Sequence, residues 1–432
     1  MYMDIDNYNP WWRTKHVPTS LIGRKRSIFN EVLKYLKNRQ ILLFTGIRRV
    51  GKTTLMFQLM HELLSNRDVE PYHIFYFSFD EKVDDIDQLI KVYEEQILKD
   101  SISDKKVYLF FDEIQKLKDW PDKIKIIYDM NPNVKICLSG SAQILLLKNT
   151  GESLAGRFFN FRVEPLDFDE YLQFKQIDID TRREKVFELE IKKQMIGYLH
   201  AGGFIEAIPM DEEKHIKYFK ESLIERVVFK DIPEAFNTGI RGLLYTLLRI
   251  IAERPGIYLD YKNLSNDLKY DHRTIAEYLS YLDYTLFIQR LYNYSNKLIT
   301  SEKKLRRAYL SNTAFTLAMN PQIEFPLLIE QFIINILKTA FFYRSPQKEE
   351  IDTIYVKDRL VIPIEIKIRN KITEKDAKSM FRFMNAFEIH QGIIISKEQE
   401  DITKQDNKLI HLIPYWKYWS LKGLLSGGGI HY

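Results

Sequence analysis

The stretch Gly46-Ile-Arg-Arg-Val-Gly-Lys-Thr-Thr54 decides the fold of the first part of this chain. It follows an apolar run at residues 41–45, which predicts a buried strand, and it leads into apolar residues at helical spacing from Thr53 to about Leu64. A strand, a turn of the form G-x-x-x-x-G-K-[ST] and a helix in this order are typical of a phosphate-binding loop. The order therefore predicts an α/β domain with a site for a nucleoside triphosphate.

Each residue type in this loop suits a triphosphate. Backbone N–H groups of a glycine-rich turn point at the β-phosphate, Lys52 adds positive charge for the β and γ oxygens, and the Thr53 hydroxyl would ligate Mg²⁺. We therefore expect ATP and Mg²⁺ as cofactors. A glycine turn without a ligand is the alternative interpretation. The loop residues expected to contact the nucleotide are Gly46, Arg49, Val50, Gly51, Lys52, Thr53 and Thr54.

Hydrolysis also requires a carboxylate that orients the metal and a group that activates water. Residues 107–111 form an apolar, strand-like run that ends in Asp112-Glu113, the form of a Walker B motif. We expect Asp112 to hold the Mg²⁺ water shell and Glu113 to polarise the attacking water. Two acids after a strand would also suit the start of an ordinary helix.

Two further positions are candidates for contacts with the γ-phosphate. The strand-like run from Lys135 ends in Ser139-Gly-Ser141, so Ser139 or Ser141 is a candidate sensor, although a strand-to-helix cap explains these residues equally well. Arg157 precedes the apolar run 158–163 and would reach the γ-phosphate held by a neighbouring subunit, as an arginine finger does. That role implies a homo-oligomer, at least transiently; a solvated surface arginine is the alternative.

The order of these motifs resembles a family of archaeal and bacterial AAA+ ATPases with a poorly characterised C-terminal region. The likeness extends along the whole chain. The resemblance implies a parallel sheet of strand order 5-1-4-3-2 with a helical lid. Besides the phosphate-binding loop, the matching segments are Asp112-Glu-Ile-Gln115, Ser139-Gly-Ser141, Ser153-Leu-Ala-Gly-Arg157, Pro165 to Tyr171, Asn9-Pro-Trp-Trp12 and Gly202-Gly-Phe204.

Residues 241–310 have the pattern of a winged helix. A helix at 243–252 is followed by a short helix at 261–268, a tight break, and a second helix that opens on His272, Arg273 and Thr274. The segment holds twelve Lys and Arg against seven Asp and Glu, with a cluster at Lys303, Lys304, Arg306 and Arg307. We expect these residues to contact DNA phosphates. A protein-binding module is the alternative.

The last part of the chain carries four residues that resemble the PD-(D/E)xK nuclease fold. Asp352 and Glu365-Ile-Lys367 lie on two strands joined by a turn near residues 357–359, and residues 365 and 367 point to the same face. Glu330, on a preceding helix, matches an acid seen in some of these nucleases. Asp352 and Glu365 would bind Mg²⁺, with Lys367 beside them. Many such domains are inactive and only bind, so an inactive version is the alternative.

The composition agrees with several domains and no membrane segment. The 432 residues are 45% hydrophobic with a net charge of +5, a single cysteine lies in an apolar run, and neither a run of eighteen apolar residues nor a signal-peptide pattern occurs. We expect a cytoplasmic α/β protein with no membrane partner. The expected parts are an N-terminal segment (1–20), an AAA+ P-loop core (21–172), a helical lid (173–239), a winged helix (240–318) and a PD-(D/E)xK-like α/β domain (319–432).

The predicted function is Mg²⁺-dependent ATP hydrolysis coupled to an action on DNA. Two alternatives remain. One is a nucleotide-dependent protein-binding switch with an inactive nuclease-like fold, and the other is an ATP-regulated, metal-dependent DNA nuclease.

Overall fold

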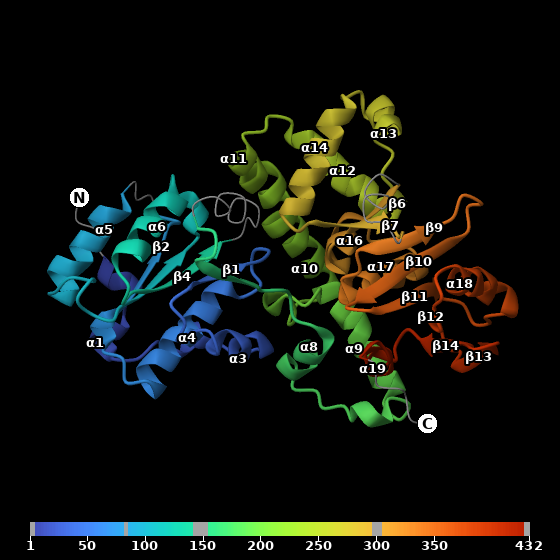
Figure 1. Cartoon of the computed structure of the whole chain (residues 1–432), viewed down its shortest axis with the longest axis horizontal. Helices are drawn as coiled ribbons and strands as arrows, with labels where there is room; N and C mark the ends of the chain where they lie inside the picture. The colour runs from blue at the N-terminus through green and yellow to red at the C-terminus, as the bar shows by residue number, and fades with distance from the viewer. Residues whose placement is uncertain (1–4, 82–84, 141–153, 296–304, 427–432) are drawn as a thin grey trace. The chain divides into compact units, whose positions relative to one another are not determined.

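The computed structural model describes residues 5–81, 85–140, 154–295 and 305–426 (Figure 1). The chain forms two compact units. The N-terminal unit holds Met1–Leu166 and Phe204–Glu206, and the C-terminal unit holds Asp167–Gly203 and Ala207–Tyr432. The chain therefore passes between the units more than once.

A five-stranded parallel sheet forms the centre of the N-terminal unit. Its order is β2-β3-β4-β1-β5, which confirms the expected order 5-1-4-3-2. The strands are β1 (Ile41–Thr45), β2 (Ile74–Ser78), β3 (Tyr108–Asp112), β4 (Lys135–Gly140) and β5 (Phe158–Arg162). Every residue of β1, β3 and β4 is buried, because central strands of a parallel sheet are covered on both faces. Cys137 is buried in β4, where burial raises the pKa of its thiol to about 12.

Three helices of this unit precede the first strand, and each of the next three follows a strand, as in other parallel α/β sheets. They are α1 (Trp11–Thr14), α2 (Thr19–Ile22), α3 (Ser27–Leu33), α4 (Lys52–Asn66), α5 (Ile86–Tyr93) and α6 (Trp120–Met130). The helix α4 begins directly after the phosphate-binding loop, and α5 begins where the Asp85 carboxylate accepts the Asp87 N–H group.

The N-terminal segment covers the edge strand β2. The Asn9 amide nitrogen donates to the Tyr76 carbonyl at 2.9 Å, and its oxygen accepts the Tyr76 N–H group at 2.7 Å. The indole N–H groups of Trp11 and Trp12 both donate to the Ile74 carbonyl, at 3.0 and 2.9 Å. An open strand edge invites pairing with other chains. The Asn-Pro-Trp-Trp motif therefore satisfies part of this edge from within the chain.

The C-terminal unit begins with helices, in the region where a lid was expected. They are α8 (Phe168–Phe174), α9 (Glu188–Ala201), α10 (Glu212–Lys217), the π-helical segments Tyr218–Glu225 and Val227–Asp231, and α11 (Ile232–Phe236). The helix α9 joins α16 (Thr313–Met319) through a hydrogen bond from the Thr313 hydroxyl to the Leu199 carbonyl. These helices group with the C-terminal part of the chain. The short segment Phe204–Glu206, between α9 and α10, belongs to the N-terminal unit.

Nine strands form one mixed sheet in this unit. Its order is β13-β14-β12-β11-β10-β9-β7-β8-β6. The strands are β6 (Ile257–Tyr258), β7 (Ile288–Asn293), β8 (Arg306–Leu310), β9 (Phe341–Arg344), β10 (Glu350–Lys357), β11 (Leu360–Lys367), β12 (Gln391–Ser396), β13 (Asp401–Gln405) and β14 (Lys408–Pro414). We expected the strands before and after residue 319 in separate domains. Parallel pairing of β7 with β9 instead joins them in a single sheet.

Further helices complete the C-terminal unit. They are α12 (Arg241–Glu253), α13 (Tyr261–Leu268), α14 (His272–Tyr284), α17 (Phe325–Leu337), α18 (Glu374–Ala386) and α19 (Tyr418–Leu425). Met380 and Met384 of α18 pack in a core cluster with Ile354 and Ile394 of the sheet. Within the described part of the chain, no helix combines the length and the apolar character that crossing a bilayer demands.

Candidate functional site

The loop between β1 and α4 has the backbone conformation of a phosphate cradle. Gly46 has φ +149° and Gly51 has φ +94°, both in the region that favours glycine. A Cβ on Gly46 would lie 2.2 Å from the Val163 carbonyl oxygen, so no side chain fits there. Lys52 is buried, and its ammonium donates to the Gly46 and Ile47 carbonyls at 3.0 and 2.9 Å. Its charge is therefore held inside the loop.

Asp112 lies beside this loop and accepts from several hydroxyl groups. The Thr53 hydroxyl donates to its Oδ2 at 2.6 Å, the Tyr76 hydroxyl donates to the same oxygen at 3.2 Å, and the Ser139 hydroxyl donates to its Oδ1. The N–H group of Glu113 donates to Oδ1 at 3.0 Å. Burial, followed by the charge of Asp112, raises the pKa of Tyr76 well above its usual value. Tyr76 therefore stays a hydrogen-bond donor to this carboxylate.

Strand register explains why these residues meet. In the parallel sheet Phe111 pairs with Leu138, and Ser78 pairs with Asp112. Asp112 and Ser139 consequently follow neighbouring positions at the carboxyl ends of β3 and β4. The carboxyl edge of a parallel sheet is where α/β proteins bind their ligands. The structure thus brings the predicted residues Thr53, Asp112 and Ser139 together, whereas Ser141 lies outside the described residues.

A cavity of about 380 Å³ opens beside this group. It is lined by Arg48, Arg49, Gly51, Lys52, Thr53, Thr54, Asp80, Asp112, Glu113, Ile205 and Glu206. Gly46 and Val50, also predicted to contact the nucleotide, are outside this lining, and Val50 is buried. The cavity therefore combines the cationic loop with the carboxylates of Asp112 and Glu113.

The sequence did not indicate Arg48 as a contact, nor two segments of the lining that lie outside the loop. The Glu206 carboxylate forms an ion pair with the Arg49 guanidinium, with 2.8 Å between oxygen and nitrogen. Ile205, the preceding residue, also lines the cavity. Both follow the Gly202-Gly-Phe204 motif, whose sequence indicated only a family likeness. Asp80, two residues after β2, is also in the lining and pairs with Lys116. No local pattern connects either segment to the phosphate-binding loop.

Glu113 has a distinctive backbone conformation. Its φ of +51° is in the left-handed region, which is uncommon for a residue with a side chain. Such strain is often found where a side chain must point at a ligand. The Glu113 carboxylate accepts from the Gln115 amide and lies in the cavity lining.

Arg157 lies at the opposite end of the sheet in its own chain. It directly precedes β5, and its carbonyl accepts the N–H group of Ile41, the first residue of β1. Its guanidinium makes a two-point ion pair with Asp129, at 2.9 and 3.0 Å. The phosphate-binding loop follows the carboxyl end of β1. Arg157 therefore lies at the amino-terminal ends of the strands, whereas the nucleotide cavity of the same chain lies at their carboxyl ends.

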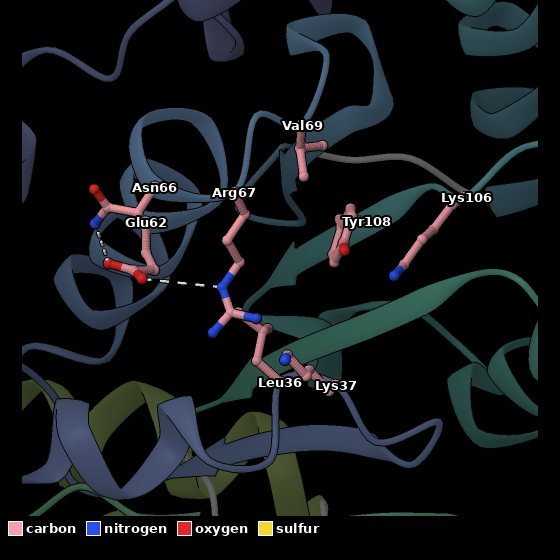
Figure 2. Close-up of a pocket in the computed structure, with 8 residues that line it drawn as sticks. All are labelled: Leu36, Lys37, Glu62, Asn66, Arg67, Val69, Lys106 and Tyr108. Carbon is pink, nitrogen blue, oxygen red and sulfur yellow. Dashed lines mark hydrogen bonds and ion pairs between the residues drawn. The ribbon is translucent and has the colours of Figure 1, made fainter.

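A second, larger cavity of about 640 Å³ occupies this amino-terminal edge of the sheet. Figure 2 shows Arg67 at its centre, with Glu62 on one side and Tyr108 and Lys106 on the other. Glu62 accepts from Asn66 at 2.6 Å and lies 3.9 Å from the Arg67 nitrogen. None of the site residues predicted from the sequence lies in this lining.

The helix pair α13–α14 presents polar residues to solvent. Lys269 ends α13 with φ +60°, and the Asp271 carboxylate caps α14 by accepting the Arg273 N–H group at 2.8 Å. His272 and Arg273, the first residues of α14, are exposed. The predicted basic cluster is divided. Lys303 and Lys304 lie outside the described residues, and Arg306 stacks over Tyr292 at 5.1 Å.

Arg307 corrects one expectation. We counted it among the residues that contact DNA phosphates, but its side chain is buried. Its guanidinium donates to the Gly256 carbonyl at 2.9 Å and to Glu330 at 2.9 Å. Alternation along β8 turns this side chain inward together with Tyr309, which is why a charge count along the sequence misassigned it.

The structure brings Asp352, Glu365, Lys367 and Glu330 into one cluster. The β10–β11 register, with Thr353 opposite Ile364, places Asp352 beside Glu365. The Lys367 ammonium lies 2.6 Å from Glu365, and Arg307 connects Asp352 with Glu330. Burial, followed by the charge of Asp352, raises the pKa of Glu330 to about 7 and that of Glu365 to about 8.

Three protein families match successive parts of the chain. Residues 38–172 match the AAA domain, residues 192–324 match a domain of unknown function (DUF8612), and residues 328–418 match another domain of unknown function (DUF4143).

Two uncharacterised proteins of Methanocaldococcus jannaschii are similar along most of their length. One is 24% identical over 93% of this chain and 92% of the relative, and the other is 26% identical over 85% and 83%. A protein of Haemophilus influenzae is 25% identical over 61% of this chain and 65% of its own length.

Among solved structures, a Walker-type ATPase of Pyrococcus abyssi matches with a TM-score of 0.42 and 17% identity, covering 70% of this chain and 97% of that one. The ORC2 protein of Aeropyrum pernix in its ADP form matches with a TM-score of 0.33 and 14% identity, covering 76% and 98%. The chain thus carries a nucleotide-binding AAA domain on a five-stranded parallel sheet, followed by a helical region and a mixed nine-stranded sheet.

Proposed function

We propose that this protein is a Mg²⁺-dependent ATPase whose turnover drives an action on DNA. One observation carries the enzymatic part. The Asp112 carboxylate at the end of β3 accepts the Thr53 hydroxyl at 2.6 Å, within a cavity that also holds the Lys52 side chain and the Glu113 carboxylate. This is the set of groups that phosphoryl transfer to water requires.

The donor set fits a magnesium ion. Thr53 and Asp112 offer hydroxyl and carboxylate oxygens at one point, and Mg²⁺ in such sites uses one or two protein oxygens together with phosphate oxygens and water. We assign Thr53 and Asp112 to hold the ion, which neutralises charge on the phosphates when bound. Lys52 would leave the loop carbonyls for the phosphate oxygens, and Ser139 would orient Asp112.

Charge in the cavity favours the metal complex over free ATP. Its lining holds the cations Arg48, Arg49 and Lys52 and the carboxylates Asp80, Asp112, Glu113 and Glu206. The ion pair of Asp80 with Lys116 leaves three carboxylates against three cations, so the lining alone does not neutralise a triphosphate. A bound divalent ion supplies the missing positive charge. We therefore expect nucleotide affinity to depend on Mg²⁺.

Glu113 is the proposed general base. Glu113→Gln should lower kcat by about 10²- to 10⁴-fold, the usual contribution of such a base, while nucleotide affinity stays within about threefold. Asp119→Asn is the matched control, because Asp119 is exposed on the same connection and also has a positive φ, which asparagine tolerates. Turnover that is unchanged in Glu113→Gln would remove Glu113 from the reaction.

Arg157 is proposed to act on a neighbouring copy. Its place at the amino-terminal ends of the strands supports a role in trans, because the cavity of its own chain lies at their carboxyl ends. It would first have to leave Asp129. Mixing Arg157→Ala with Lys52→Ala chains tests this idea. If the arginine acts across chains, mixed oligomers regain ATPase activity that neither variant has alone, and no recovery at any mixing ratio argues against it.

DNA contact is proposed through the start of α14. The exposed Arg273 follows a capped turn, the geometry in which a second helix presents its first residues to a groove. The test is the ATPase rate with and without single- and double-stranded DNA, together with DNA affinity at several salt concentrations. We expect DNA to raise the ATPase rate. We also expect the slope of log DNA affinity against log salt concentration to be smaller by about one in Arg273→Ala than in the wild type. Slow turnover without salt-dependent DNA binding would favour the protein-binding switch instead.

A further inference from the structure

The charge cluster of the C-terminal unit contains a cation that the nuclease resemblance does not account for. Arg307 comes from β8, whereas the four nuclease-like residues come from α17 and the β10–β11 hairpin. Its NH2 donates to Glu330 at 2.9 Å, and its NH1 lies 3.8 Å from the Asp352 carboxylate. The guanidinium thus lies between two of the acids that would have to hold a metal.

Arg307 is fixed from several sides. Its Nε donates to the Gly256 carbonyl at 2.9 Å, and its carbon centre lies 5.4 to 5.8 Å from the rings of Tyr258, Tyr309 and Phe342. Gly256 has φ +80°, and a Cβ there would come within 2.5 Å of the guanidinium. The NH1 atom is buried and makes no hydrogen bond within the described structure. It is held by the packing of these rings and by the nearby charge of Asp352.

Most carboxylate oxygens of the cluster already face a hydrogen-bond donor or a cation. Oδ2 of Asp352 accepts the Ile366 N–H group at 2.8 Å, and Oδ1 faces Arg307. In Glu365, Oε1 meets the Lys367 ammonium at 2.6 Å and Oε2 accepts the Asp352 N–H group at 3.3 Å. Oε1 of Glu330 accepts from both Arg307 and the Tyr309 hydroxyl. Mg²⁺ demands near-octahedral geometry, and the Arg307 guanidinium occupies the space between Asp352 and Glu330 that such an ion would need.

The donor set therefore does not fit the metal that the resemblance implies. Across the described residues, no three His, Cys, Asp or Glu side chains are arranged so that they could hold a metal ion. Two cations, Arg307 and Lys367, already face the three carboxylates. A divalent ion would add charge where charge is nearly balanced, and Arg307 would have to move out through packed aromatic rings.

We propose that the guanidinium of Arg307 stands where the nuclease resemblance would put a divalent metal. The cluster is then a metal-independent tie that fastens β8 to α17 and to the β10–β11 hairpin, and it holds no catalytic ion. Its task is to join the strands near the helix pair α13–α14 to the nuclease-like strands. This inference does not depend on the proposed ATPase function.

Counting bound Mn²⁺ on the full-length chain tests the proposal. Free Mn²⁺ is followed by its electron paramagnetic resonance signal, without nucleotide, for the wild type and for Asp352→Asn. The asparagine keeps an oxygen for the Ile366 N–H group, so the fold should persist. Any ion near Thr53 and Asp112 contributes equally to both proteins. We expect the same number of bound ions in both. One ion fewer in Asp352→Asn would overturn the proposal.

Substitution of Arg307 provides the complementary result. Arg307→Met removes the cation while keeping an unbranched side chain. We expect this variant to bind one Mn²⁺ more than the wild type. The double variant Arg307→Met with Asp352→Asn should lose that extra ion. If Arg307→Met fails to fold, Arg307→Lys retains the charge and should bind as many ions as the wild type. A gain of an ion in Arg307→Lys would contradict the assignment. Asp358→Asn, an exposed acid in the β10–β11 turn, is the matched control.

Discussion

Asn9 is expected to be a main support of strand β2, and Asn9→Ala measures how much it contributes. Its side chain is 1% exposed. It donates to the Ile5 carbonyl at 2.8 Å and to the Tyr76 carbonyl at 2.9 Å, and it accepts the Tyr76 N–H group at 2.7 Å. Alanine would leave these three backbone groups without their partner.

The magnitude follows from those lost bonds. A buried polar group left unpaired costs about 1 to 3 kcal/mol, and Tyr76 alone would have two such groups. Water entering the space left by the side chain would recover part of the cost. We therefore expect Asn9→Ala to lower the free energy of unfolding of the N-terminal unit by about 3 kcal/mol. The same change should loosen Tyr76, whose hydroxyl donates to Asp112.

Two measurements give this value and its location. Tryptophan fluorescence during denaturation gives the unfolding free energy and includes this segment, because Trp11 and Trp12, two of the five tryptophans, are bonded to Ile74. Hydrogen exchange of the peptide 74–78 shows whether β2 opens locally. Asn38→Ala, at an exposed position, is the control and should stay within about 0.5 kcal/mol of the wild type. Unchanged exchange of β2 in Asn9→Ala would refute the idea that Asn9 closes this edge.

Three further predictions concern the two glycine positions and the buried acids. Gly46→Ala should weaken nucleotide binding at least about tenfold in a fluorescent-nucleotide titration, because its Cβ would lie 2.2 Å from the Val163 carbonyl oxygen; wild-type affinity would show that the loop adjusts freely. Gly256→Ala should destabilise the C-terminal unit by about 2 kcal/mol in denaturant melts, because its Cβ would come within 2.5 Å of Arg307, and a neutral result would mean that the guanidinium has room to move. Burial raises the folded-state pKa of Glu365 to about 8, so the folded state binds more protons than the unfolded state, and stability should fall as pH rises toward and through that value. Glu365→Gln should flatten this slope between about pH 5 and pH 8 in melts at fixed ionic strength, and an unchanged slope would assign it to other groups.

The nucleotide site was largely predictable because its signals are local. The loop from Gly46 to Thr54 and the acids at the end of the 107–111 run each follow a buried strand, and parallel strands present their carboxyl ends at one edge. Knowing the two strand ends was therefore enough to expect Thr53 and Asp112 near each other. The structure puts their side-chain oxygens 2.6 Å apart.

Other features depend on pairings between distant segments. The nine-stranded sheet exists because Tyr292 of β7 pairs with Phe341 of β9, and no local pattern predicts that partnership. Arg307 was misassigned for the same reason. Its sequence neighbours are basic, but its role depends on acids that follow it by 23 and 45 residues, at Glu330 and Asp352. Sequence spacing predicts which residues are charged, and tertiary packing decides which of them face solvent.

The three residues Phe204–Glu206 give the N-terminal unit a discontinuous chain. Both flanking segments, ending at Gly203 and resuming at Ala207, belong to the other unit, yet Ile205 and Glu206 line the nucleotide cavity. A fragment that stops at Leu166 would lack the carboxylate that pairs with Arg49 and one wall of the cavity. The N-terminal unit therefore cannot be isolated complete by a single cut, and nucleotide binding measured on such a fragment would describe an incomplete site.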